Sequence, residues 1–291
     1  YICTQALHWK TKEGLVRMCA CRGTAGFVHV SCLAEQAKIL MDEAEENRLS
    51  EKVFNERWVR WHSCSLCEQR HHGFVVCALG WACWKTYVGR PERDRLRVMA
   101  MSVLGNGLLT AGHHEDALPV QEAELALKRR LGADEDDLLI TQTNLANTYK
   151  QLGRVEEALR LRRDVYRGRL NLNGEEHVDT VDAANNHAVS LIHSKRVREA
   201  RALLCKALPV ARRILGDNSD LTLIIRWNYA TALYKDAGAT LDDLREAVTT
   251  LEDTERTARR VLGGANPTTA DIERELKKSR AKLRSRETPD A

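Results

Sequence analysis

The chain has 291 residues, of which 43% are hydrophobic and 30% are charged, and its formal net charge is +4. This balance is typical of a soluble globular protein, and it excludes a disordered chain and one embedded in a membrane. The length predicts two domains or one long repeat array, and so mild a charge gives no support to a nucleic-acid partner.

Cysteines are concentrated in the first third of the chain, where eight of the nine occur. The opening residues lack the basic and apolar pattern of a secretory signal, so we interpret these cysteines as metal ligands rather than disulfides. Zinc takes four tetrahedral ligands, and closely spaced pairs allow one tight turn to present two of them. The candidate ligands are the pairs Cys19 and Cys21, His29 and Cys32, Cys64 and Cys67, together with the single Cys3.

These candidates give seven ligands, whereas two complete tetrahedral sites need eight. A cysteine directly before Tyr1 would form Cys-Tyr-Ile-Cys, a fourth pair with two intervening residues. We therefore expect the eighth ligand immediately upstream of the chain.

The order of ligands resembles the RING-CH, or RING-variant, zinc finger. The matching pieces are Cys19-Ala-Cys21-Arg-Gly23, Phe27-Val-His29-Val-Ser-Cys32-Leu33 and Cys64-Ser-Leu-Cys67. The seven residues between Cys21 and His29 favour this family over the related PHD finger. The resemblance implies a cross-braced fold with two zinc ions. In that fold Cys3, His29 and Cys32 share one ion with the upstream cysteine, and Cys19, Cys21, Cys64 and Cys67 hold the other.

RING-CH fingers recruit a ubiquitin-conjugating enzyme and promote ubiquitin transfer by positioning it. On the family pattern, Ile2 and Leu66 form part of the surface for this partner. The sequence departs from the family at Gln36, where a tryptophan is usual, and an acidic helical segment containing Asp42 and Glu46 lengthens the stretch before Cys64. These departures weaken the ligase interpretation, and Gln36 together with the missing first ligand favours the alternative hypothesis, a non-catalytic adaptor with a structural zinc finger.

The segment 73–97 is expected to connect the finger to the next domain. Its nearly uninterrupted apolar run, 74–84, has 11 residues, whereas a membrane-spanning helix needs about 20. His71, His72, Cys77 and Cys83 could form a further metal site. We favour the alternative that the two cysteines pack with Trp81 and Trp84, because free cysteine is usually buried.

From Val98 onward the sequence repeats itself. Ala117, Ala158, Ala200 and Ala247 each follow two charged residues at spacings of 41, 42 and 47, and a set of glycines has the spacings 42, 42 and 47. The shared increase of five predicts one insertion, around 237–242. Each unit contains two amphipathic helices, with small residues where the helices cross. These small residues are Gly105, Ala146, Ala188 and Ala230.

The repeats resemble the tetratricopeptide repeat in its kinesin-light-chain form. The best match is Asn144-Leu-Ala-Asn-Thr-Tyr149-Lys-Gln-Leu-Gly153-Arg-Val-Glu-Glu-Ala158-Leu, and the resemblance covers residues 98 to about 270. It implies a groove for a peptide or protein segment, lined by the first helix of each unit. Asn144, Asn186 and Asn228 recur there, and their amides suit either a bound peptide backbone or a neighbouring helix.

The predicted protein is therefore mainly α, with a small cross-braced zinc finger followed by an α-solenoid of about four helix-pair repeats. We assign residues 1–72 to the finger, 73–97 to the connection, 98–270 to the repeats and 271–291 to a basic capping helix or tail. The favoured function is a ubiquitin ligase whose repeats recruit a protein substrate. The expected location is the cytoplasm, with the nucleus as the alternative, since the cysteines suit a reducing compartment.

Overall fold

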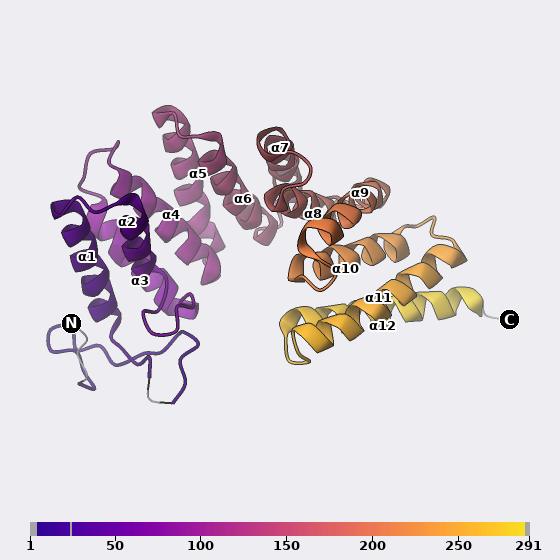
Figure 1. Cartoon of the computed structure of the whole chain (residues 1–291), viewed down its shortest axis with the longest axis horizontal. Helices are drawn as coiled ribbons and strands as arrows, with labels where there is room; N and C mark the ends of the chain where they lie inside the picture. The colour runs from indigo at the N-terminus through magenta and orange to yellow at the C-terminus, as the bar shows by residue number, and fades with distance from the viewer. Residues whose placement is uncertain (1–4, 24, 289–291) are drawn as a thin grey trace. The chain divides into compact units, whose positions relative to one another are not determined.

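The computed structural model describes residues 5–23 and 25–288, and within them the protein is mainly α-helical, as predicted (Figure 1). It contains twelve α-helices and one short 3-10 helix, η1, while the only β structure among these residues is three isolated bridges. The chain forms two compact units, Tyr1–Leu152 and Gly153–Ala291.

The first unit contains an irregular cysteine-rich segment followed by helices. Their bounds are α1 (Val30–Glu46), α2 (Glu51–Trp58), η1 (Val59–Trp61), α3 (Gly73–Tyr87), α4 (Arg95–Thr110), α5 (His114–Leu131) and α6 (Glu135–Gln151). The acidic helical segment of the sequence is the end of α1. Its other face is apolar and buries Met41 and Ala44 in a core with Trp61 and Tyr87. The acidic face forms ion pairs with other segments of the unit, such as the one between Glu45 and Arg90 at 2.7 Å.

Helices α3 and α4 pack closely because glycines lie at their crossing. A Cβ added to Gly107 would lie 2.8 Å from the Val76 carbonyl oxygen, and one added to Gly80 would lie 3.1 Å from the Leu104 Cα. Helix α3 falls in the segment predicted as a connection. Its apolar residues are buried against both α1 and α4, so this segment is part of the core of the unit.

The second unit is a run of antiparallel helix pairs. Its helices are α7 (Val155–Asn173), α8 (Val178–His193), α9 (Val197–Leu215), α10 (Asp220–Lys235), α11 (Leu241–Val261) and α12 (Pro267–Glu287). Each helix packs against the next one in the chain (Figure 1). Helix α12 covers α11, with Ile272 and Leu276 buried, and it begins with Asn266 as its N-cap and Pro267 in its first turn.

The small residues and the insertion predicted for the repeats are also seen in the structure. Ala146, Ala188 and Ala230 are fully buried, and Gly105 lies against the side chain of Gln121. The predicted insertion falls at the α10–α11 connection, where Thr240 and Asp243 form a capping box that begins α11. No helix among the described residues is long and apolar enough to cross a membrane.

Candidate metal centre

Four cysteines from two distant stretches of the chain meet at one point. The Sγ atoms of Cys19, Cys21, Cys64 and Cys67 all lie within 4.8 Å of one another, and those of Cys21 and Cys64 are 3.8 Å apart. Ligands on a tetrahedral zinc ion with Zn–S bonds of about 2.3 Å are separated by about 3.8 Å. The spacing and the all-thiol donor set therefore fit a structural zinc ion.

The turn that carries Cys64 and Cys67 is held by backbone hydrogen bonds. The Cys64 N–H donates to the Gln69 carbonyl, the Glu68 N–H donates to the Cys64 carbonyl, and the Leu66 N–H donates to the Cys64 Sγ at 3.4 Å. Glu68 adopts a positive φ of 57°, which reverses the chain immediately after Cys67. The two sulfurs of this turn are thus positioned by the protein backbone.

Gly26 holds the other cysteine pair in place. Its φ is +80°, and a Cβ added there would lie 2.6 Å from the Cys21 Cβ and 3.1 Å from the Cys19 Sγ. Any side chain at this position would therefore displace the pair. An isolated antiparallel β-bridge pairs Val16 with Val28, which directly precedes the predicted ligand His29.

Protonation of these thiols depends on their neighbours. The Gln69 N–H lowers the pKa of Cys67 to about 7, which favours the thiolate that binds metal. Burial and the surrounding thiols raise the pKa of Cys21 to about 12. Four thiolates this close repel one another, and a divalent cation among them would reverse this unfavourable electrostatic energy.

Two of the ligands predicted for the second ion are also adjacent. The Nδ1 atom of His29 lies 3.8 Å from the Cys32 Sγ, and both side chains are buried. The Nε2 atom of His29 is buried without a hydrogen-bond partner among the described residues. Cys3 lies outside the described residues. His8, which the sequence did not single out, has its ring 5.3 Å from that of His29, and only its position near Cys3 could have drawn attention to it.

The residues predicted to contact a conjugating enzyme are visible in part. Leu66 is 67% exposed between Cys64 and Cys67, whereas Ile2 lies outside the described residues. Large exposed apolar side chains also occur at Trp9 and Phe27, neither of which was predicted to contact the conjugating enzyme. The finger therefore presents apolar groups to solvent that its small core does not use.

The remaining cysteines and histidines before residue 84 do not gather as metal ligands within the described part of the chain. Cys83 is fully buried, and Cys77 packs with Trp84 beside α4, as favoured from the sequence. The expectation that Trp81 packs with them is wrong, because it projects to solvent and is 43% exposed.

The three recurring asparagines lie on α6, α8 and α10, the first helices of their units. Asn228 is buried, and its amide donates to the Asn185 side chain at 2.8 Å, which joins α10 to α8. The Asn186 amide donates to Asp182 on its own helix, and Asn144 is half-buried. At Asn228, the amide thus serves the fold through a neighbouring helix.

Comparison with known proteins finds a matching family for each of two regions of the chain. Residues 1–49 match the RING-variant domain family, and residues 138–179 and 180–220 match the tetratricopeptide repeat family. The chain therefore carries a RING-variant domain at its N-terminus, followed by tetratricopeptide repeats. Cys64 and Cys67 lie beyond the matched part of the finger, and the structure brings them to Cys19 and Cys21.

Individual curated relatives match part of the chain at low identity. The clustered mitochondria protein homologs of Ajellomyces capsulatus and Emericella nidulans are 27% and 26% identical over 136 residues. In both cases the match covers 44% of this chain and only 10% of the relative. The chain thus spans about a tenth of the length of these curated relatives.

Solved structures resemble the repeat architecture. The nearly identical TPR-like repeats of a Podosopora anserina protein, described as a kinesin light chain, match with a TM-score of 0.54 and 18% identity, covering 80% of this chain and 97% of that one. The apo form of RapI matches with a TM-score of 0.51 and 11% identity, covering 87% and 85% of the two chains. At these identities the likeness establishes the fold alone.

Proposed function

We propose that this chain is a ubiquitin ligase. Its RING-variant domain would hold two zinc ions and recruit a ubiquitin-conjugating enzyme, and its repeats would recruit the protein that receives ubiquitin. The observation that carries the proposal is Leu66, an exposed apolar side chain on a turn between two of the four clustered cysteines. We place this activity in the cytoplasm, where thiols remain reduced.

The rigid turn at Leu66 suits a docking role. Its backbone N–H is held by the Cys64 sulfur, so the backbone that carries this 67% exposed apolar side chain is fixed. Ordering such a group before binding lowers the entropic cost of association. We propose Ile2 as a second contact on the same partner.

Cys19, Cys21, Cys64 and Cys67 would hold one zinc ion, and Cys3, His29 and Cys32 would contribute to the second. Bound zinc would supply a structural cross-link between the two halves of the finger. The protein's own role in ubiquitin transfer would be to hold and orient the charged conjugating enzyme, since catalysis by positioning needs no covalent step on the finger. The first helices of the repeats would supply the substrate surface, with Asn144 on α6 and Asn186 on α8, whereas the buried Asn228 amide already joins α10 to α8.

Autoubiquitination of the full chain with a panel of conjugating enzymes tests the proposal. Leu66→Ala is expected to lower transfer roughly tenfold, as for an interface anchor, without lowering zinc content. Leu241→Ala, which truncates an exposed leucine of similar size in the repeats, is the matched control and should leave transfer unchanged. Absence of transfer with every conjugating enzyme, in protein shown to contain zinc, would refute ligase activity.

The second candidate function is an adaptor whose finger binds protein without promoting transfer. Gln36, half-buried on α1 where the family usually has tryptophan, favours it. The same panel distinguishes the two candidates. An adaptor with a folded, zinc-loaded finger would show no transfer, whereas a ligase would lose detectable transfer on Cys64→Ala.

A further inference from the structure

A groove with a basic end and an apolar end runs between α7 and α9 over α8. The basic end is a cavity of about 560 Å³, whose lining includes Arg160, Arg163, Arg167, Arg196, His187 and Glu199. The apolar end is a smaller cavity of about 260 Å³, and the two share Tyr166 and Leu203. The two cavities are therefore neighbours, and together they are called here the α7–α9 groove.

The basic end is built by the spacing of arginines on α7. Arg160, Arg163 and Arg167 lie three and four residues apart, so they share one face of the helix, and all three are exposed. Arg196, from the turn before α9, approaches the same cavity. Four guanidinium groups thus line the cavity with two carboxylates, those of Glu156 and Glu199.

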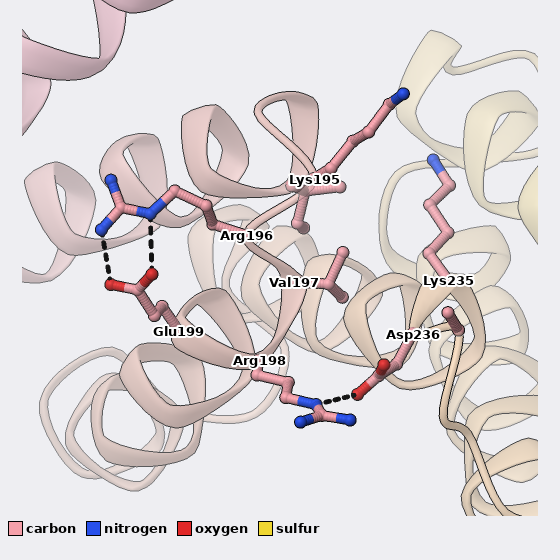
Figure 2. Close-up of a pocket in the computed structure, with 9 residues that line it drawn as sticks. Lys195, Arg196, Val197, Arg198, Glu199, Lys235 and Asp236 are labelled. Atoms are coloured by element: carbon pink, nitrogen blue, oxygen red, sulfur yellow. Dashed lines mark hydrogen bonds and ion pairs between the residues drawn. The ribbon is translucent and has the colours of Figure 1, made fainter.

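Two of these arginines are already paired. Arg196 donates two hydrogen bonds of 2.7 Å to the Glu199 carboxylate (Figure 2), and Arg163 lies 2.9 Å from Asp164. Within the described part of the chain, Arg160 and Arg167 form no ion pair. Their charges are therefore available to a ligand.

The floor of the basic end holds an unused polar atom. The His187 ring stacks on Tyr166, with centroids 6.3 Å apart, and its Nδ1 is buried without a hydrogen-bond partner among the described residues. Burial and then the nearby arginines, Arg196 foremost, lower the pKa of His187 to about 4. An anion in this cavity would offset the repulsion between the four arginines that line it.

The apolar end adds a requirement of its own. Val181, Ala184 and Val210 line it together with Tyr166 and Leu203, and only Glu175 and Lys206 bring charge. A ligand that fills both ends must therefore carry an apolar group beside an anionic one.

We propose that the α7–α9 groove binds a peptide segment of a partner protein in which an acidic side chain lies next to an apolar one. The acidic side chain is held by Arg160 and Arg167, and the apolar side chain occupies the end lined by Val181 and Val210. Charge complementarity favours this occupant. Glu156 and Glu199 would repel a continuous polyanion such as RNA, whereas a single acidic side chain can avoid them.

The α7–α9 groove is distinct from the surface proposed for the substrate. On α8 the groove-lining residues 180, 184, 187 and 191 recur at helical spacing and form one stripe. Asn186 lies about 140° around the helix from that stripe, at 3.6 residues per turn. The inference therefore holds whether or not the finger promotes ubiquitin transfer.

Selection of short random peptides displayed on phage against the full chain tests the proposal. Peptides that also bind the variant Arg160→Glu/Arg167→Glu are removed by counter-selection, so that only ligands dependent on these arginines remain. Both residues are exposed on α7, so the variant should fold, which circular dichroism verifies. The expected outcome is enrichment of Asp or Glu next to an apolar residue.

Fluorescence anisotropy of the enriched peptides then supplies the decisive comparison. We expect Arg160→Glu/Arg167→Glu to weaken binding roughly tenfold or more, as for lost charge pairs. Arg256→Glu/Arg284→Glu makes the same charge change on α11 and α12 and should leave affinity unchanged. Failure of any peptide to survive counter-selection would overturn the proposal. So would survivors without acidic residues, or tighter arginine-dependent binding of poly-uridine RNA.

Discussion

The ammonium group of Lys128 lies 2.8 Å from the Glu124 carboxylate one turn earlier on α5, and each side chain is only 6% exposed. Lys128 also contacts Asp137 at 2.7 Å and the Thr141 hydroxyl at 2.9 Å, both on α6. Burial acts to lower the pKa of Lys128, but these carboxylates raise it overall, so the lysine remains charged. This buried pair joins α5 to α6 in the first unit.

Lys128→Met is expected to destabilise the first unit by about 3–5 kcal/mol, because it leaves Glu124 as an uncompensated buried charge. The double variant Lys128→Met/Glu124→Leu should recover much of this loss, since no buried unpaired charge remains and Asp137, which also loses its partner, is 42% exposed. Urea unfolding followed by circular dichroism measures both. Equal stability of the single variant and the unaltered protein would show that water or rearrangement compensates Glu124.

Removal of zinc is expected to unfold the finger while leaving the second unit intact, because structural zinc sites contribute folding energy directly. Cys67→Ser should lower the zinc content in the same way. Cys205→Ser, which alters an exposed thiol on α9, is the control and should not change it. Elemental analysis measures the metal, and hydrogen exchange reports protection in each unit. Zinc content that is unchanged by Cys67→Ser would exclude this cysteine as a ligand.

Gly107→Ala is expected to destabilise the first unit by about 1–3 kcal/mol through overpacking, even though alanine favours a helix by about 1 kcal/mol. The added methyl group would lie 2.8 Å from the backbone of α3, which cannot move aside as a flexible side chain could. Gly89→Ala, where nothing lies within 4 Å, is the control. Thermal unfolding compares the two, and a stabilised Gly107→Ala protein would contradict the close α3–α4 packing.

Acidification is expected to destabilise the second unit through His187. Its pKa is about 4 in the folded protein, against the usual 6.5, because it is buried and lies near Arg196, Arg163 and Arg167. Between these values the unfolded chain binds more protons, so stability rises as the pH rises from about 4 to 6.5 and falls on acidification.

His187→Gln should reduce this pH dependence, whereas His193→Gln, at an exposed histidine of the same helix, should preserve it. Guanidinium unfolding at a series of pH values makes the comparison. An identical pH dependence in all three proteins would mean that His187 does not titrate as described.

The repeats were predictable because their signal is local and recurs. Ala158 and Ala200 mark successive second helices at a spacing of 42, and the same landmarks predicted where the longer α10–α11 connection falls. Helix α3 was missed as an element of the core. It is apolar on most sides, so its sequence has no amphipathic period to reveal it, and the glycines that bring it onto α4 look like breakers in a sequence.

The internal arrangement of the finger was harder to predict from the sequence than that of the repeats. The convergence of Cys19 and Cys21 with Cys64 and Cys67 followed from a family resemblance, because spacing alone does not specify which pairs share an ion. The contact of His8 with His29 depends on how an irregular loop folds back, and a single sequence does not record that. Similarly, Asn185 was not identified as the partner of Asn228, since the pairing depends on the rotation of α8 against α10.

The position of Cys21 and Cys64 in the chain has a topological consequence. The two residues are 43 positions apart, and helices α1 and α2 lie between them. A bond through a shared ion closes that stretch into a loop, and closing a loop of this length removes about 4 kcal/mol of entropy from the unfolded chain, by analogy with a disulfide. The loop closure stabilises α1 in particular, and Met41 of this helix is part of the same core as Tyr87 of α3. Loss of the ion would therefore destabilise the core that α1 and α3 share with α4, the first repeat helix.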